Sequence, residues 1–106
     1  MITELSDATI QKYLERRADD YRLCLTALTS GDYQSIARVG HNMKGNGETF
    51  GFPELSSLGT ELELAALSKN IQHMEQMITR FETWVNGHFA KGPQSQSLNQ
   101  IIPPVF

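Results

Sequence analysis

The chain has 106 residues, of which 40% are hydrophobic and 20% are charged, and its formal net charge is −3. This length predicts a single domain, because one hydrophobic core typically serves about 100–150 residues. It excludes an enzyme with separate substrate and cofactor domains. The mild acidity argues against a general nucleic-acid-binding protein, which needs a cationic face to displace counterions from phosphates.

The cysteine count and the hydropathy pattern together predict where the protein works. Cys24 is the single cysteine, so the chain cannot form an internal disulfide, as is usual in a reducing compartment. No apolar run approaches the roughly 20 residues that span a bilayer, and the first residues lack the basic-then-apolar order of a signal peptide. We therefore expect a cytoplasmic protein that binds neither nucleic acid nor membranes. We also expect it to be a monomer.

The first periodic segment predicts an amphipathic helix that ends at Gly31. Ser6 or Asp7 can cap its start, because their side chains accept hydrogen bonds from free N–H groups. Arg17 falls on the buried stripe, where we expect its stem to be covered and its charge to reach water. The apolar members of that stripe recur at spacings of three and four: Ile10, Tyr13, Leu14, Tyr21, Cys24 and Leu28.

The second predicted helix follows Asp32, which can cap it, and ends at Gly51. Its inward face is marked by apolar and small residues at helical spacing. They are Ile36, Val39, Gly40, Met43, Gly47 and Phe50.

A third helix is predicted to begin at Pro53 and a fourth to follow Asn70 as its cap. Gly59 permits a close neighbour on the inner face of the third helix. The other inward residues are Leu55, Leu58, Leu62, Ala65 and Ala66 in the third helix and Ile71, Met74, Met77, Ile78, Phe81, Trp84 and Val85 in the fourth. Short connections between amphipathic helices favour antiparallel neighbours, so we predict an all-α, up-down-up-down four-helix bundle over residues 1–90.

Residues 91–106 differ in composition from the rest of the chain. A stretch rich in Gly, Pro, Gln and Ser precedes an apolar end, Ile101–Phe106. We expect this tail to be flexible or loosely packed on the bundle. Because a short apolar segment with prolines can serve as a ligand, a docking peptide is the alternative.

The polar face of the second helix carries the most informative residues. With Ile36 at the centre of the buried face and about 100° per residue, His41 lies about 140° away and points to solvent. Lys44 and Glu48 lie at about 80° and 120°, on the same strip. An accessible imidazole with a lysine one turn later suits an anion. Glu48 could orient the imidazole, but we favour a plain surface carboxylate.

Gly45 lies on this exposed strip at about 180°, where core packing does not explain it. A glycine inside a helix costs about 1 kcal/mol relative to alanine. Gly40 and Gly47 point inward, where the absence of a Cβ allows close helix packing. We predict that Gly45 provides clearance for another molecule to approach the imidazole, the alternative being that all three glycines are merely tolerated.

These residues resemble a known signature. His41-Asn42-Met43-Lys44-Gly45, followed by Gly51 and Leu55, is similar to that of the histidine-containing phosphotransfer (HPt) domain family. That signature reads His, any residue, an aliphatic residue, Lys, Gly, and later a Gly and a Leu. Met43 stands where leucine is commoner. The resemblance covers about residues 7–89 and includes Gly31-Asp32 and Leu62-Glu63.

The resemblance implies a phosphoryl carrier without independent turnover. By it, His41 accepts a phosphoryl group from the aspartyl phosphate of a receiver domain and relays it to another receiver aspartate. The expected partners are the receiver domains of hybrid histidine kinases and of response regulators. Lys44 would neutralise phosphoryl charge and Gly45 would leave steric clearance. No cofactor is expected on this chain, since Mg²⁺ would be bound by the receiver.

Alternative functions remain open at this point. The bundle could be an adaptor that binds signalling partners without phosphorylation, or the phosphoryl-accepting domain of a larger histidine kinase. A start at Met1 and an end soon after the fourth helix favour a free-standing protein. A di-iron site is not expected, because no histidine follows a glutamate by three residues. His73 and His88 are predicted at the surface or the core edge.

Overall fold

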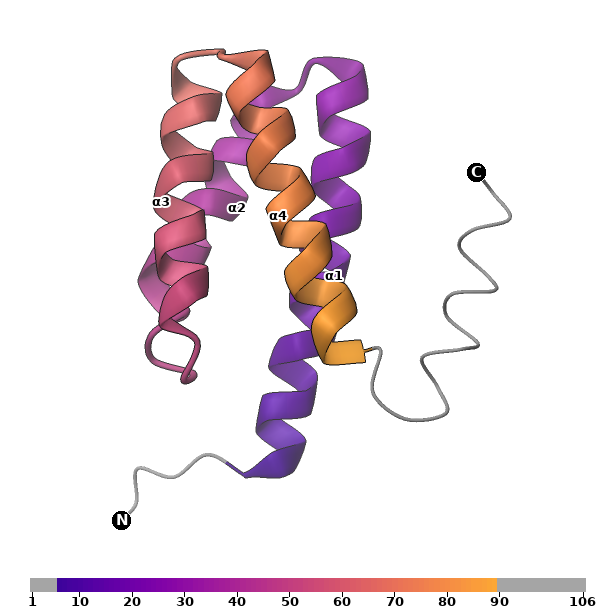
Figure 1. The fold of residues 1–106 in the computed structure, drawn as a ribbon, viewed down its shortest axis with the longest axis vertical. Helices are drawn as coiled ribbons and strands as arrows, with labels where there is room; N and C mark the ends of the chain where they lie inside the picture. The colour runs from indigo at the N-terminus through magenta and orange to yellow at the C-terminus, as the bar shows by residue number, and fades with distance from the viewer. Residues whose placement is uncertain (1–5, 90–106) are drawn as a thin grey trace, which may run out of the picture.

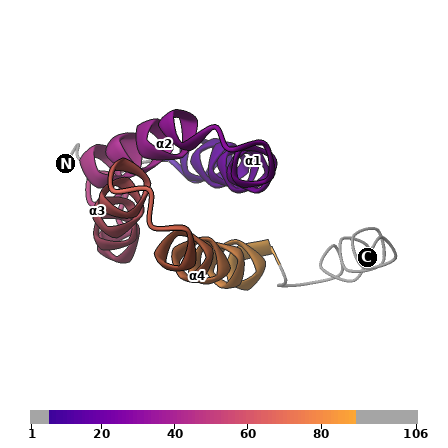
Figure 2. The ribbon, with the colours of Figure 1, turned by 90° about the horizontal axis from the view of Figure 1, so that it is seen from above.

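The structure, a computed structural model, describes residues 6–89 and forms four α-helices. They are α1 (Asp7–Ser30), α2 (Tyr33–Asn46), α3 (Pro53–Leu67) and α4 (Ile71–Phe89). In Figure 1 the first and third connections lie at the top and the second at the bottom, so consecutive helices run in opposite directions. Each helix contacts its two neighbours in a ring, as the view from above shows (Figure 2). The predicted all-α four-helix bundle is confirmed, while the predicted tail, 91–106, lies outside the described residues.

Most helix ends follow from the capping residues in the sequence. The Ser6 side chain accepts a hydrogen bond from the N–H of Thr9, and the Asp32 side chain accepts one from the N–H of Ser35. Gly31 ends α1 with a φ of 79°, in the left-handed region that favours glycine. The Asn70 side chain likewise accepts a hydrogen bond from the N–H of His73. The three predicted caps and the predicted glycine stop are therefore confirmed.

The predicted end of the second helix at Gly51 is wrong. The α2 helix ends at Asn46, and residues 47–51 form a turn. Gly47 is buried where a Cβ would lie 2.6 Å from the backbone nitrogen of Ser56. The N–H of Glu48 donates to the Ser56 hydroxyl oxygen at 2.8 Å instead of continuing the helix. Contact with the first turn of α3 thus overrides the helical periodicity.

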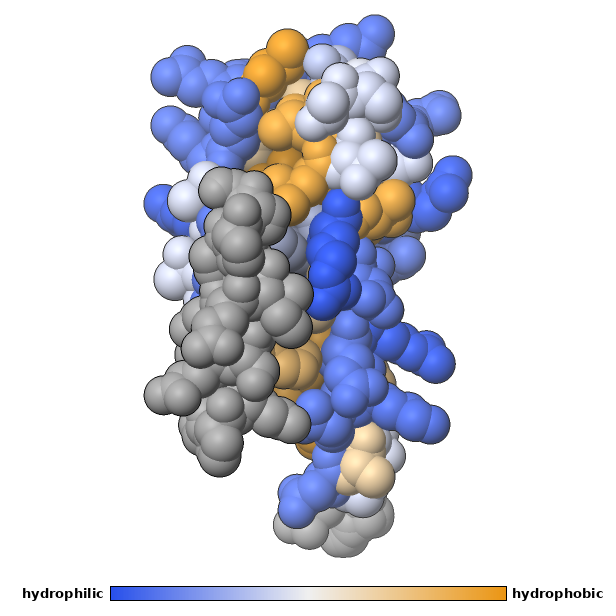
Figure 3. All heavy atoms as spheres, turned by 90° about the vertical axis from the view of Figure 1, so that its right-hand side faces the viewer, coloured by the Kyte–Doolittle hydropathy of each residue, from blue (hydrophilic) through white to orange (hydrophobic). Residues whose placement is uncertain are grey.

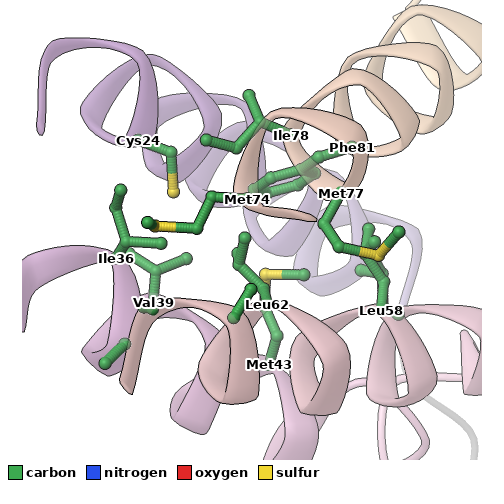
Figure 4. Packing of buried hydrophobic residues seen from close by; sticks show 14 of the residues in the cluster. Cys24, Ile36, Val39, Met43, Leu58, Leu62, Met74, Met77, Ile78 and Phe81 are labelled. Atoms are coloured by element: carbon green, nitrogen blue, oxygen red, sulfur yellow. The ribbon is translucent and has the colours of Figure 1, made fainter. Parts of the chain in front are cut away.

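The core receives side chains from all four helices (Figure 4). Its largest fully buried members are Phe81, Ile36, Met43, Leu55, Leu62, Met74 and Cys24. Burial raises the pKa of the Cys24 thiol to about 12, so the thiol stays protonated at neutral pH. Within residues 6–89, no helix is both long enough and apolar enough to cross a membrane.

Figure 3 shows the face formed by α1 and α4, where apolar side chains are visible between hydrophilic ones. A pocket of about 330 Å³ lies between these helices, lined in part by Tyr21, Val85 and Phe89. None of its lining residues is a predicted site residue. The predicted site residues all lie on α2.

Candidate functional site

The predicted site residues share the exposed face of α2. The side chains of His41 and Lys44 are 66% and 44% exposed. Gly45 is also exposed, and a Cβ added to it would meet no atom within 4 Å. The structure therefore brings together the accessible imidazole, the cation and the open space that the sequence predicts.

A carboxylate on α3 joins the imidazole to the lysine. One oxygen of Glu63, Oε2, lies 3.1 Å from His41 Nδ1, and the other, Oε1, lies 3.0 Å from Lys44 Nζ. The Glu63 side chain is only 18% exposed. One partly buried carboxylate thus holds both candidate site residues of α2 at once.

Glu63 reaches these residues because α2 and α3 cross with their backbones in contact. A Cβ on Gly40 would lie 2.6 Å from the Glu63 nitrogen and 2.7 Å from the Gly59 carbonyl oxygen. A Cβ on Gly59 would lie 2.6 Å from both the Gly40 oxygen and the Lys44 nitrogen. Real Cβ atoms do not approach backbone this closely, so only glycines allow the crossing. The predicted packing roles of Gly40 and Gly59 are confirmed.

The charge of Glu63 determines which nitrogen of His41 carries the proton. The hydrogen bond from Lys44 holds the pKa of Glu63 below its ordinary value, although desolvation opposes it, and the hydrogen bond from His41 lowers that pKa further. An ionised carboxylate can only accept hydrogen bonds. The His41 Nδ1–H therefore donates to Glu63, which leaves the lone pair of the neutral ring on Nε2.

Comparison with protein families matches residues 8–87 to the Hpt domain. The chain belongs to the Hpt domain family. This membership implies a phosphotransfer role in two-component signalling, in which Hpt domains interact with receiver domains and act as phosphocarriers. Neither the curated proteins nor the solved structures include a significant match to the chain.

We expect Lys44→Gln to raise the pKa of Glu63 towards its ordinary value, because the lysine is the main cause of the lowered pKa. His41→Gln should raise it less. The lowered pKa also means that this interaction stabilises the fold at neutral pH and is lost as pH falls through that pKa. A carbon-detected NMR titration of the Glu63 carboxyl measures the change. Lys69→Gln is the control. If the pKa of Glu63 rises as much in that variant, Lys44 is not the specific cause of the lowered pKa.

Glu63 is the site residue whose role the sequence reasoning missed. The carboxylate that helical spacing places beside His41 is Glu48, which lies exposed in the turn after α2 and makes no side-chain hydrogen bond or ion pair with residues 6–89. A usable signal was present: inward glycines on consecutive helices, Gly40 and Gly59, predict a close crossing. Glu63 lies one turn after Gly59, next to that crossing.

The other two histidines lie apart from this Hpt site. His73 Nε2 lies 3.2 Å from an oxygen of Glu61, and the His88 ring packs against Phe52 and Trp84. Both are only partly exposed, in keeping with the predicted surface or core-edge positions. Over the described part of the chain, no group of three or more His, Cys, Asp or Glu side chains is placed to hold a metal ion.

Proposed function

We propose that this Hpt domain is a phosphorelay intermediate and that His41 is its phosphoryl acceptor. The proposal rests mainly on the hydrogen bond that His41 Nδ1–H donates to Glu63, in an imidazole that is 66% exposed. It fixes the ring orientation and leaves Nε2 as the nucleophilic nitrogen. Phosphoryl transfer depends mainly on such positioning and on electrostatic stabilisation, which this small site can supply.

The proposed step balances without a cofactor on this chain. The Nε2 lone pair forms a bond to phosphorus in line with the receiver's P–O bond, which breaks and leaves the receiver's aspartate as a free carboxylate. The ring becomes positively charged as Nε2 gives up its lone pair, and the Glu63 carboxylate at Nδ1 stabilises that charge. Lys44 lies one turn after His41, where it offers a positive charge to the phosphoryl oxygens. The reverse step delivers the group to the aspartate of a second receiver.

The proposed partners are the receiver domains of hybrid histidine kinases and of response regulators. Such a receiver contributes the aspartate and binds Mg²⁺ itself, so this chain acts as a carrier and does not turn over alone. We propose that the carrier is a cytoplasmic monomer.

The test is phosphorylation of the protein by isolated receiver domains from its source organism. We expect at least one phosphorylated receiver to transfer its phosphoryl group, giving an acid-labile, base-stable label on this chain. Nitrogen-15 NMR of the product should place phosphorus on Nε2. Failure of every receiver would overturn the relay function, and a label on Nδ1 would overturn the role given to Glu63. A label that comes only from a histidine kinase domain would favour the alternative of a domain within a larger kinase.

We expect Gly45→Leu to slow transfer from a receiver by about 100-fold, because displacing the reacting groups by about 1 Å costs that much. The fold should tolerate the change, since a Cβ at Gly45 meets nothing within 4 Å. Transfer rates and thermal melting measure the two effects. Gly87→Leu is the matched control, because a Cβ on this helical glycine also meets nothing. Unchanged transfer by the Gly45 variant would overturn the clearance role.

A further inference from the structure

A basic pocket lies where the first turns of α1 pass the end of α2. Its volume is about 340 Å³, and we call it the basic pocket. Its lining residues are Thr9, Lys12, Tyr13, Arg16, Arg17, Asn46 and Phe50. Three of the nine lysines and arginines of the chain line it, and no aspartate or glutamate of residues 6–89 does, although the chain carries a net charge of −3. In Figure 1 the first turns of α1 project beyond the neighbouring helices.

Two of these cations have no counterion among the described residues. Lys12 and Arg16 are exposed and form no ion pair with residues 6–89. Arg17 differs, because it pairs with Asp20 at 2.9 Å and its side chain is only 11% exposed. The prediction that the Arg17 charge reaches water is thus wrong: the guanidinium lies 4.6 Å from the ring centroid of Tyr13, and the buried Nε has no hydrogen-bond partner in the part of the chain that the structure describes.

The neutral lining residues give the basic pocket a stacked aromatic wall and a further hydrogen-bond donor. The Tyr13 hydroxyl donates to Asn46 Oδ1 at 2.6 Å, which leaves the Asn46 amide hydrogens free to donate. The Tyr13 ring stacks on Phe50 with centroids 4.2 Å apart. The basic pocket therefore presents positive charge and N–H donors on a fixed aromatic wall, a combination that suits a carboxylate.

The basic pocket lies close enough to His41 to be covered by the same partner. Asn46 follows His41 by five residues on α2, which in a regular helix puts their Cα atoms about 9 Å apart. Even a small transient interface covers about 600 Å² of each partner, or a disc of about 14 Å radius. A protein centred on His41 is therefore large enough to reach the basic pocket.

We propose that the basic pocket docks a carboxylate-bearing segment of the receiver domain beside its phosphorylated aspartate. The proposal rests on the proposed function. A receiver needs an acceptor aspartate and further carboxylates for its Mg²⁺, so its reacting face is acidic, complementary to Lys12 and Arg16. Rim charges of this kind act mainly on the association rate and on the salt dependence of binding. The basic pocket therefore acts on encounter with the receiver and leaves the chemistry at His41 unchanged.

The test compares the double variant Lys12→Gln/Arg16→Gln with wild type. The probe is a receiver domain that phosphorylates the wild-type protein. At low salt we expect kcat/KM for transfer to fall about tenfold in the variant. The transfer rate at a saturating concentration of the receiver should be unchanged. Added salt should slow the wild type and have little effect on the variant. The matched control Lys69→Gln/Arg80→Gln removes two positive charges outside the basic pocket and should behave as wild type.

Phosphoramidate separates failure of this proposal from failure of the proposed function. It phosphorylates histidine directly, with its P–N bond broken and ammonia released, and needs no receiver. The proposal is supported if phosphoramidate labels the variant and wild type equally while transfer from the receiver is slowed only in the variant. If the variant accepts the phosphoryl group from the receiver as fast as wild type does, the docking role is wrong and His41 remains the acceptor. The same holds if the control variant loses as much transfer rate as the basic pocket variant. If the basic pocket variant instead loses affinity for a single-stranded RNA probe and keeps receiver transfer, the basic pocket serves nucleic acid and the proposal is wrong. Absence of any label on wild type from receivers would overturn the proposed function itself.

Discussion

Replacing His41 by glutamine is expected to lower phosphoryl transfer by more than about 1,000-fold, the scale seen when a nucleophile is removed. Glutamine has similar length and polarity, but its amide nitrogen has no available lone pair. The imidazole is 66% exposed, so the fold should persist without it. Transfer from a phosphorylated receiver, measured beside circular dichroism, separates loss of chemistry from loss of structure.

His73→Gln is the matched control for this prediction. His73 also lies beside a glutamate, Glu61, but outside the α2 site. We expect the control to transfer at the wild-type rate. If the His41 variant is phosphorylated to the same extent as wild type, the acceptor has been assigned to the wrong residue. The same conclusion follows if the His73 variant is no longer phosphorylated.

Gly59→Ala is expected to destabilise the bundle by about 2 kcal/mol. The added Cβ would lie 2.6 Å from two backbone atoms, the Gly40 oxygen and the Lys44 nitrogen, which cannot move as a flexible side chain can. Overpacking of this kind costs about 3 kcal/mol, and the higher helix propensity of alanine returns about 1 kcal/mol. For a domain of this size the melting temperature should fall by about 10 °C.

The same substitution should disturb the site, because α3 must move away from α2 and take Glu63 with it. We expect the NMR signals of the His41 ring to shift and receiver transfer to slow, even at temperatures where the variant is folded. Gly87→Ala is the control, since a Cβ there meets nothing within 4 Å and alanine favours the helix. A Gly59 variant as stable as this control would show that the close crossing is not required.

The helices and most of their ends could be predicted from sequence because their causes are local. Periodic apolar residues define the buried stripes, while Ser6, Asp32 and the left-handed Gly31 act within one turn of the ends they mark. The end of α2 could not be predicted in this way. There the Ser56 side chain, eight residues further along the chain, takes the hydrogen bond of Glu48.

For the site, the sequence by itself determined the nucleophile candidate, the cation and the open position, His41, Lys44 and Gly45. All three lie on one helix, where spacing alone sets their direction. Only the tertiary structure decided that Glu63 joins His41 to Lys44, and thereby which ring nitrogen donates to the carboxylate. The physical reason is that this contact crosses from α3 to α2, and its distance depends on how closely two backbones pack. Helical periodicity carries no information about that separation.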